Sequence, residues 1–211
     1  MRFTSVLPRV ALVLIGGLVT AGLVAPPASA ADTPVDLACQ ATPPIGSAQT
    51  FDLHAGVNAT APDSVAAGSR FSVTLAPDPL TVPTSVSGYT LKSISGIRLT
   101  VPVPANATLV GESITGGTNP GSASVAVSGS DVIVTVNSSI AGGSTFTLPA
   151  LTLDLTAGAA GSTVQTALGG TSYASPGLTF TATVPLGFFT VQVPTACFPS
   201  SQQILSSTNI S

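Results

Sequence analysis

Residues 151–156 of this chain read Leu-Thr-Leu-Asp-Leu-Thr, with an aliphatic side chain at every second position. Because successive side chains of a β-strand point to opposite faces, this pattern predicts a strand with one core face and one polar face. The same alternation occurs in residues 70–75, 97–103 and 178–184, where threonine fills many of the polar positions. Threonine is β-branched and suits a pleated, half-exposed surface. These runs predict an all-β fold.

Turn-forming segments separate the alternating runs. Ser128-Gly129-Ser130-Asp131 divides residues 123–127 from residues 132–136, which predicts a hairpin with a short loop. In total the pattern indicates about ten short strands, and many short strands with one polar face each favour a two-layer antiparallel β-sandwich. The tail, residues 199–211, is either a last strand or a frayed end.

The first thirty residues have the features of a cleaved signal peptide. Arg2 and Arg9 make the start basic, residues 10–24 are apolar, and Ala28-Ser29-Ala30 supplies the small residues that signal peptidase requires. The apolar run is shorter than a membrane-spanning helix and has no basic stop-transfer cluster after it, although a retained N-terminal anchor is the alternative. We therefore predict a signal peptide over residues 1–30 and one domain over residues 31–211. The domain is expected to be extracellular or associated with the cell envelope, with no transmembrane segment.

The charge of the predicted domain excludes one class of partner. Residues 31–211 contain three basic residues and eight acidic ones, a net charge of −5. A nucleic-acid-binding surface needs a basic patch, usually with aromatic side chains on which bases stack, and the domain has neither. Anionic lipid surfaces would also repel the domain.

Two cysteines, Cys39 and Cys197, lie near the two ends of the predicted domain. Export leads to an oxidising compartment, where an even number of cysteines usually forms disulfides, so we predict a Cys39–Cys197 bridge. Two buried free thiols are the alternative. The chain-entropy model gives about 5 kcal/mol of stabilisation for a loop of this length. A bridge also requires a Cα separation below about 7 Å, which would place the two ends of the domain side by side.

The sequence provides no complete set of catalytic or metal-binding residues. His54 is the only histidine, and Asp52 can share a strand face with it, but no Gly-x-Ser-x-Gly motif supplies a nucleophile. One histidine and two bridged cysteines do not make a metal site, and Glu112, the only glutamate, has no evident partner for glycoside hydrolysis. We therefore predict no enzyme activity, no catalytic or metal-binding residues and no cofactor, with an unrecognised hydrolase as an alternative.

Two segments carry a resemblance to a known class of domain. Residues 57–75 contain an Ala-Pro step, a valine and a glycine turn that leads into a strand, and in this they resemble bacterial Ig-like domains. Residues 99–104 and 141–146 look like the same class. The Cys39 start and the Cys197-Phe198-Pro199 end are similar to uncharacterised secreted proteins of actinobacteria. The resemblance implies an Ig-like sandwich in the envelope or the medium and brings no catalytic residues.

Three functions are compatible with these features. The leading prediction is a secreted, non-catalytic Ig-like module that binds at or decorates the bacterial cell envelope, with an envelope component or another protein as partner. The first alternative is a carrier that holds a lipid or other small apolar ligand between the sheets, with Leu186, Phe188 and Phe189 as candidate lining residues. The second is the hydrolase. A deep apolar pocket would favour the carrier, and a flat surface patch would favour the module.

Overall fold

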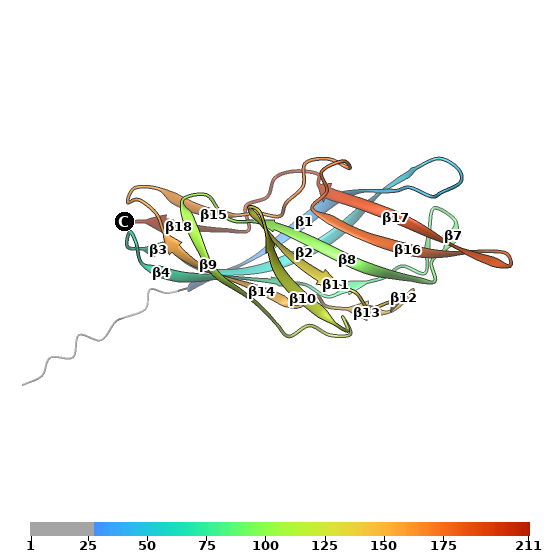
Figure 1. Ribbon diagram of the computed structural model, residues 1–211, viewed down its shortest axis with the longest axis horizontal. Helices are drawn as coiled ribbons and strands as arrows, with labels where there is room; N and C mark the ends of the chain where they lie inside the picture. The colour runs from blue at the N-terminus through green and yellow to red at the C-terminus, as the bar shows by residue number, and fades with distance from the viewer. Residues whose placement is uncertain (1–27) are drawn as a thin grey trace, which may run out of the picture.

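The computed structural model describes residues 28–211, and all regular elements in this range are β-strands (Figure 1). The all-β prediction is confirmed. Most of the predicted signal peptide, residues 1–27, lies outside the described residues. The described part is elongated, and Ser211 lies at the end of the long axis opposite the β16–β17 hairpin (Leu178–Leu186 and Phe189–Pro199).

Eleven strands form one continuous antiparallel sheet. Ten of them, in hydrogen-bonded order, are β10 (Ala123–Ser128), β11 (Asp131–Val136), β8 (Ser93–Pro102), β16, β17, β1 (Ala28–Ala41), β2 (Gln49–Pro62), β4 (Arg70–Pro77), β14 (Ala150–Ala157) and β9 (Ala107–Thr115). The eleventh, β12 (Ile140–Ala141), pairs with the start of β8.

Seven short strands complete the fold in three small sheets. They are β13 (Thr145–Phe146) with β5 (Leu80–Thr81), β6 (Ser85–Val86) with β7 (Tyr89–Thr90), and β15 (Thr163–Thr166) with β18 (Ser206–Ile210) and β3 (Ser64–Val65). The tail is therefore a strand rather than a frayed end, since β18 pairs with both β15 and β3 and buries Ile210.

The large sheet folds over on itself instead of dividing into the two separate sheets that the sequence predicted. Its two end strands, β9 and β10, lie close to each other, and no ladder joins them within residues 28–211. The β1–β2 hairpin explains this shape. β17 pairs with β1 only at Leu37–Ala41, whereas β4 pairs with β2 only at Val57–Thr60, at the other end of the hairpin. The hairpin thus carries the sheet from one layer to the other, and the result is a nearly closed, barrel-like sheet.

The hairpin predicted around Gly129 is confirmed. β10 and β11 pair from Ala123–Val136 down to Ser128–Asp131, and Gly129 has a φ of +64° in the turn. Glycine adopts this left-handed conformation without the steric cost that a side chain would bring.

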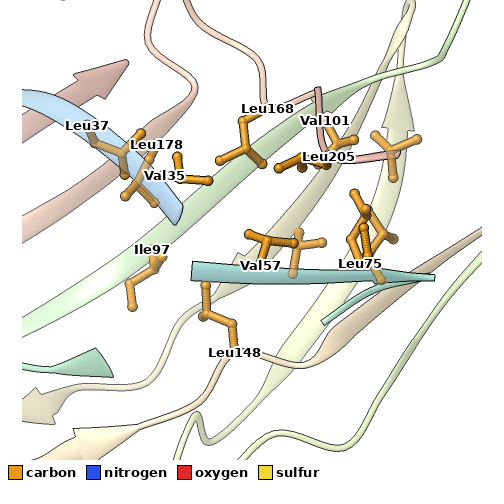
Figure 2. Packing of buried hydrophobic residues seen from close by; sticks show 14 of the residues in the cluster. Val35, Leu37, Val57, Leu75, Ile97, Val101, Leu148, Leu168, Leu178 and Leu205 are labelled. Atoms are coloured by element: carbon orange, nitrogen blue, oxygen red, sulfur yellow. The ribbon is translucent and has the colours of Figure 1, made fainter. Parts of the chain in front are cut away.

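The hydrophobic core lies between the two layers (Figure 2). Val35 and Leu37 of β1 lie near Leu178 of β16 there, while Val57 of β2 lies near Leu75 of β4. The alternating leucines of residues 151–155 are all almost completely buried. One face of each strand therefore supplies the core, as the period of two predicted.

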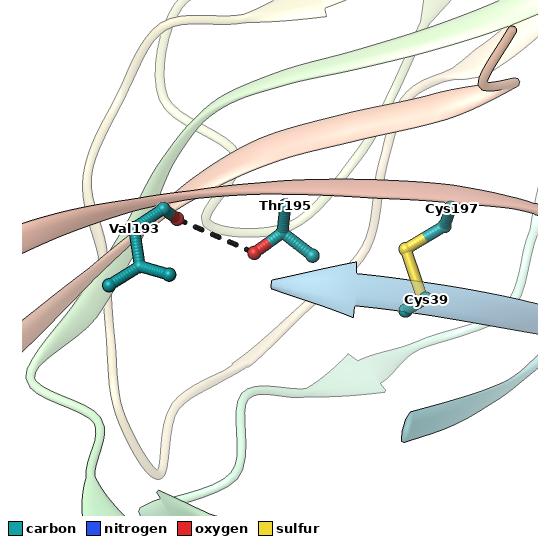
Figure 3. Close-up of a disulfide and its surroundings, with 4 residues drawn as sticks. All are labelled: Cys39, Val193, Thr195 and Cys197. Carbon is teal, nitrogen blue, oxygen red and sulfur yellow. Dashed lines mark hydrogen bonds between the residues drawn. A yellow bond between two sulfur atoms is a disulfide. The ribbon is translucent and has the colours of Figure 1, made fainter. Parts of the chain in front are cut away.

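The predicted disulfide is present and joins two neighbouring strands (Figure 3). Cys39 of β1 lies directly opposite Cys197 of β17, with a Cα–Cα distance of 4.1 Å, and both residues are fully buried. The bridge closes a loop of 158 positions and holds the beginning of the described chain against its last long strand. The sequence predicted that the two ends of the domain lie side by side, and the pairing of β1 with β17 agrees with this.

Mass spectrometry of the exported protein is expected to find Ala31 as the first residue, as the sequence pattern predicts. Cleavage there would remove the first three residues of β1, which pair with residues 60–62, and would leave Ala31 opposite Ala59 as the first pair of the β1–β2 ladder. Most of that ladder would remain, so the domain should stay folded. A protein that keeps Met1 and remains with the membranes would contradict the export prediction.

Candidate functional site

A cavity of about 760 Å³ opens at one end of the molecule, between the β16–β17 hairpin, the β1–β2 hairpin and residues 80–91. Most of the side chains that line it are aliphatic or aromatic. The cavity continues the core in the direction away from Ser211, so the same strands supply both.

The β16–β17 hairpin forms one wall because its apolar face extends beyond the core. Every second residue of β16 from Leu178 to Leu186 lines the cavity, and so does every second residue of β17 from Phe189 to Thr195. Directly opposite residues of an antiparallel pair lie on the same face, as Ala182 and Val193 do here. Ile94 of β8 lies opposite Ala182 on the other side and also lines the cavity.

The cavity exists because β4 ends before it reaches the part of β2 that lies beside the cavity. β4 ends at Pro77, opposite Val57 of β2, so within the described chain no strand pairs with Gln49–Ala55 on the side away from β1. Irregular chain and the short strands β5 to β7 cover this region instead. Leu80, Val82 and Leu91 from that cover line the cavity. Short connecting strands fill less volume than a continuous strand with regularly packed side chains, and a cavity remains.

The disulfide lies at the inner end of the cavity. Phe51, which is opposite Cys39 in the β1–β2 ladder, and Leu178, which is opposite Cys197 in the β16–β17 ladder, both line the cavity. Next to the bridge, the buried hydroxyl of Thr195 donates a hydrogen bond of 3.4 Å to the carbonyl oxygen of Val193 (Figure 3). The bridge therefore fixes the separation of the two hairpins that form the cavity.

The polar groups of the cavity are few and carry no positive charge. Gln49, Asp52, Tyr89 and Thr195 are among its lining residues, together with several serines and threonines. Within residues 28–211, no lysine, arginine or histidine lines it. A ligand with a carboxylate would find no cationic partner in this lining. The site suits a neutral molecule that is mostly apolar and can accept a few hydrogen bonds.

Of the three residues that the sequence suggested as the lining of a carrier's cavity, two line the cavity and one does not. Leu186 and Phe189 are directly opposite each other and both line the cavity. Phe188 does not line it and is fully exposed at the apex of the hairpin. Phe188 lies in the turn between Leu186 and Phe189, outside both strands, so the alternation of the strands does not direct it inward.

The structure gives His54 a different partner from the one that the sequence suggested. The hypothesis paired it with Asp52, two residues away, but its Nδ1–H donates a 2.6 Å hydrogen bond to Oδ1 of Asp36, directly opposite on β1. This hydrogen bond, with the charge of Asp36, raises the pKa of His54, and the charge of Asp52 adds a smaller effect. The pair is exposed, His54 does not line the cavity, and no serine hydroxyl bonds to its ring in the described part of the chain.

An NMR pH titration is expected to show the pKa of His54 above the ordinary value for histidine, and Asp36→Asn is expected to lower it. Asp52→Asn should lower the pKa less, because Asp52 acts only through its charge. Since the folded-state pKa is raised, the pair favours folding at pH values below the unfolded-state pKa, and this contribution disappears as the pH rises through the folded-state pKa. An equal shift in the two variants would contradict the assignment of Asp36 as the partner.

Between residues 28 and 211, no three or more histidine, cysteine, aspartate or glutamate side chains gather closely enough to hold a metal ion. No helix in that range has the length and apolar character needed to cross a membrane.

The fold and the cavity define an all-β protein with a barrel-like sheet and an apolar cavity at one end. No family model matches the chain, and no curated protein matches it. A solved structure from Corynebacterium diphtheriae, an actinobacterium, has a similar fold and is described as a "Putative membrane anchored protein". The similarity has a TM-score of 0.53 at 21% sequence identity and covers 86% of this chain. The chain corresponds to 38% of that protein's length, and at this identity the similarity establishes the fold alone.

Proposed function

We propose that this protein is a non-catalytic, envelope-associated binding protein that holds a neutral apolar molecule, such as a lipid, in the cavity. The cavity is the observation that supports this proposal most directly. Its volume of about 760 Å³ is within the range of about 300–1,000 Å³ typical of small-molecule sites. Such sites combine a mostly apolar lining with a small number of polar groups, as this one does. Of the functions that the sequence left open, the carrier is therefore favoured over a module that binds through a flat patch.

The lining residues support a neutral ligand over a fatty acid. A carboxylate removed from water needs a cationic or multiple hydrogen-bonding partner, and no lysine, arginine or histidine of the described chain lines the cavity. A molecule with hydroxyl, ester or ether oxygens would carry no charge, and Gln49 and Tyr89 could donate hydrogen bonds to it. Long-chain alcohols, acylglycerols and similar neutral lipids meet these requirements.

The envelope location and the absence of catalysis have separate support. The basic and apolar start of the sequence is typical of exported proteins, and the structural neighbour is described as membrane anchored. His54, the only histidine of the chain, lies outside the cavity and is paired with Asp36. A histidine that could act as a general base is thus missing from the place where a ligand would bind. The Ig-like character of the fold remains part of this proposal and rests on the sequence resemblance.

Lipid extraction and mass spectrometry of the protein purified from its own host are expected to identify a bound neutral lipid in a one-to-one complex. In titrations at neutral pH, a fluorescent monoacylglycerol should bind at least about tenfold more tightly than the fatty acid of equal chain length, a difference of about 1.4 kcal/mol. His54→Ala should leave both affinities unchanged, because His54 does not line the cavity. The absence of extracted lipid together with no saturable probe binding would overturn the proposal.

A further inference from the structure

The mouth of the cavity is surrounded by exposed apolar side chains. Three loops meet there: residues 42–48 between β1 and β2, residues 82–90 around β6 and β7, and residues 185–190 at the β16–β17 turn. Figure 1 places all three at the end of the molecule away from Ser211. We call these three loops the tip.

Large side chains of the tip point into solvent. They are Ile45, Tyr89, Leu186, Phe188 and Phe189. Ile45 is 87% exposed and Phe189 is 63% exposed, although both also line the cavity. Only three other large hydrophobic residues of the described chain are similarly exposed, and none of them belongs to the tip. An exposed apolar cluster of this kind marks a site of interaction.

The tip is also free of charge. None of its three loops contains an aspartate, glutamate, lysine, arginine or histidine. Protein interfaces are usually bordered by polar and charged residues and are enriched in arginine. A lipid bilayer, in contrast, accepts phenylalanine and isoleucine in its apolar region and tyrosine at its interface, and it excludes charged side chains.

We propose that the tip inserts into the surface of a lipid bilayer, so that the mouth of the cavity opens directly onto the hydrocarbon region. The choice of a bilayer as the partner rests on the proposed function, because a neutral lipid reaches the cavity from a membrane without crossing water. Insertion depends on apolar burial and not on charge, since residues 31–211 carry a net charge of −5. Binding should therefore be at least as strong on neutral vesicles as on anionic ones and should not weaken with salt.

The chain contains no tryptophan, so a single introduced indole reports on one position. The emission of Phe188→Trp is expected to shift to shorter wavelength when vesicles of phosphatidylcholine are added, because the indole leaves water. Ile204→Trp is the matched control. Ile204 is exposed and precedes β18, a strand that contributes nothing to the cavity, so its emission should not change.

A second pair of variants measures the strength of insertion. Phe188→Ser should weaken partition into phosphatidylcholine vesicles by about tenfold or more, since burial of a phenylalanine side chain is typically that favourable. Ile204→Ser should have no effect on partition. Both positions are exposed, so the two variants should keep the melting temperature of the parent protein.

The failure of the docking proposal can be distinguished from the failure of the proposed function. If Phe188→Trp shows no shift while the monoacylglycerol probe still binds in solution, docking is wrong and ligand binding stands. If the shift occurs but no apolar probe binds, docking stands and the proposed function is wrong. Two other outcomes overturn docking by apolar insertion. One is binding that requires equal parts of phosphatidylglycerol in the vesicles and disappears with salt, and the other is a shift without vesicles that accompanies dimer formation in sedimentation experiments.

Discussion

The double substitution of Cys39→Ala and Cys197→Ala is expected to lower the free energy of unfolding by about 3–5 kcal/mol. The bridge closes a loop of 158 positions, for which the chain-entropy model predicts about 5 kcal/mol, and measured values for native bridges are typically 2–5 kcal/mol. The total stability of an ordinary domain is about 5–15 kcal/mol, so the loss is a large fraction of it. Alanine is the appropriate replacement because both cysteines are fully buried, where a serine hydroxyl would need a partner.

Thermal unfolding measures this effect directly. For a domain of this size, each 1 kcal/mol corresponds to roughly 2–4 °C, so the melting temperature should fall by about 10 °C. Reduction of the parent protein should produce a similar decrease, whereas reductant should not affect the double variant. A loss below about 1 kcal/mol in both experiments would contradict the prediction. It would mean that the β1–β17 ladder holds the two ends together without the bridge.

The sequence predicted strand faces well because each face depends on local chemistry. Alternation in residues 151–156 showed which side chains would be buried, and Gly129 marked a turn between two neighbouring strands. The disulfide was also predictable, because the chain offers only two cysteines and the export predicted from the sequence makes a bridge favourable. These inferences need no knowledge of which strands lie next to each other.

The order of the strands could not be predicted, because alternation contains no information about partners. β8 pairs with β16, and β1 lies between β2 and β17, although long stretches of chain separate β8 from β16 and β1 from β17. The same limitation applies to the partner of His54. Asp52 is closer in sequence, but the register of the β1–β2 ladder places Asp36 directly opposite the ring. Register depends on the whole ladder and is not visible in a local window.

The cavity was only partly predictable for a related reason. An apolar residue on a strand face has the same sequence pattern whether it meets a core partner or an empty space. Leu186 and Phe189 were correctly included among the candidates, while Phe188 lies in the turn between the two strands and is exposed. The early end of β4 at Pro77, which leaves the space, became visible only with the pairing of β2 and β4.

Ala182→Leu is expected to weaken the binding of an apolar ligand by about 50-fold. Ala182 lies on the cavity face of β16, between Ile94 of β8 and Val193 of β17, so the added carbon atoms enter the space that the ligand would occupy. The substitution adds three carbon atoms, and each methylene group displaced from the cavity costs about 0.8 kcal/mol, or about 2.4 kcal/mol in total. Titration with the fluorescent monoacylglycerol measures this loss, since about 1.4 kcal/mol corresponds to a tenfold change in affinity.

The free energy of unfolding of Ala182→Leu provides a second, independent measurement. Ala182→Leu should leave the free energy of unfolding unchanged or raise it slightly, because the larger side chain fills existing space. Ala59→Leu is the matched control, since Ala59 is 1% exposed in the core and does not line the cavity. Overpacking there should lower stability by about 1–3 kcal/mol and leave the affinity of the folded protein unchanged. If Ala182→Leu destabilised the protein as Ala59→Leu does and kept its full affinity, the cavity would be closed in solution and could not be the binding site.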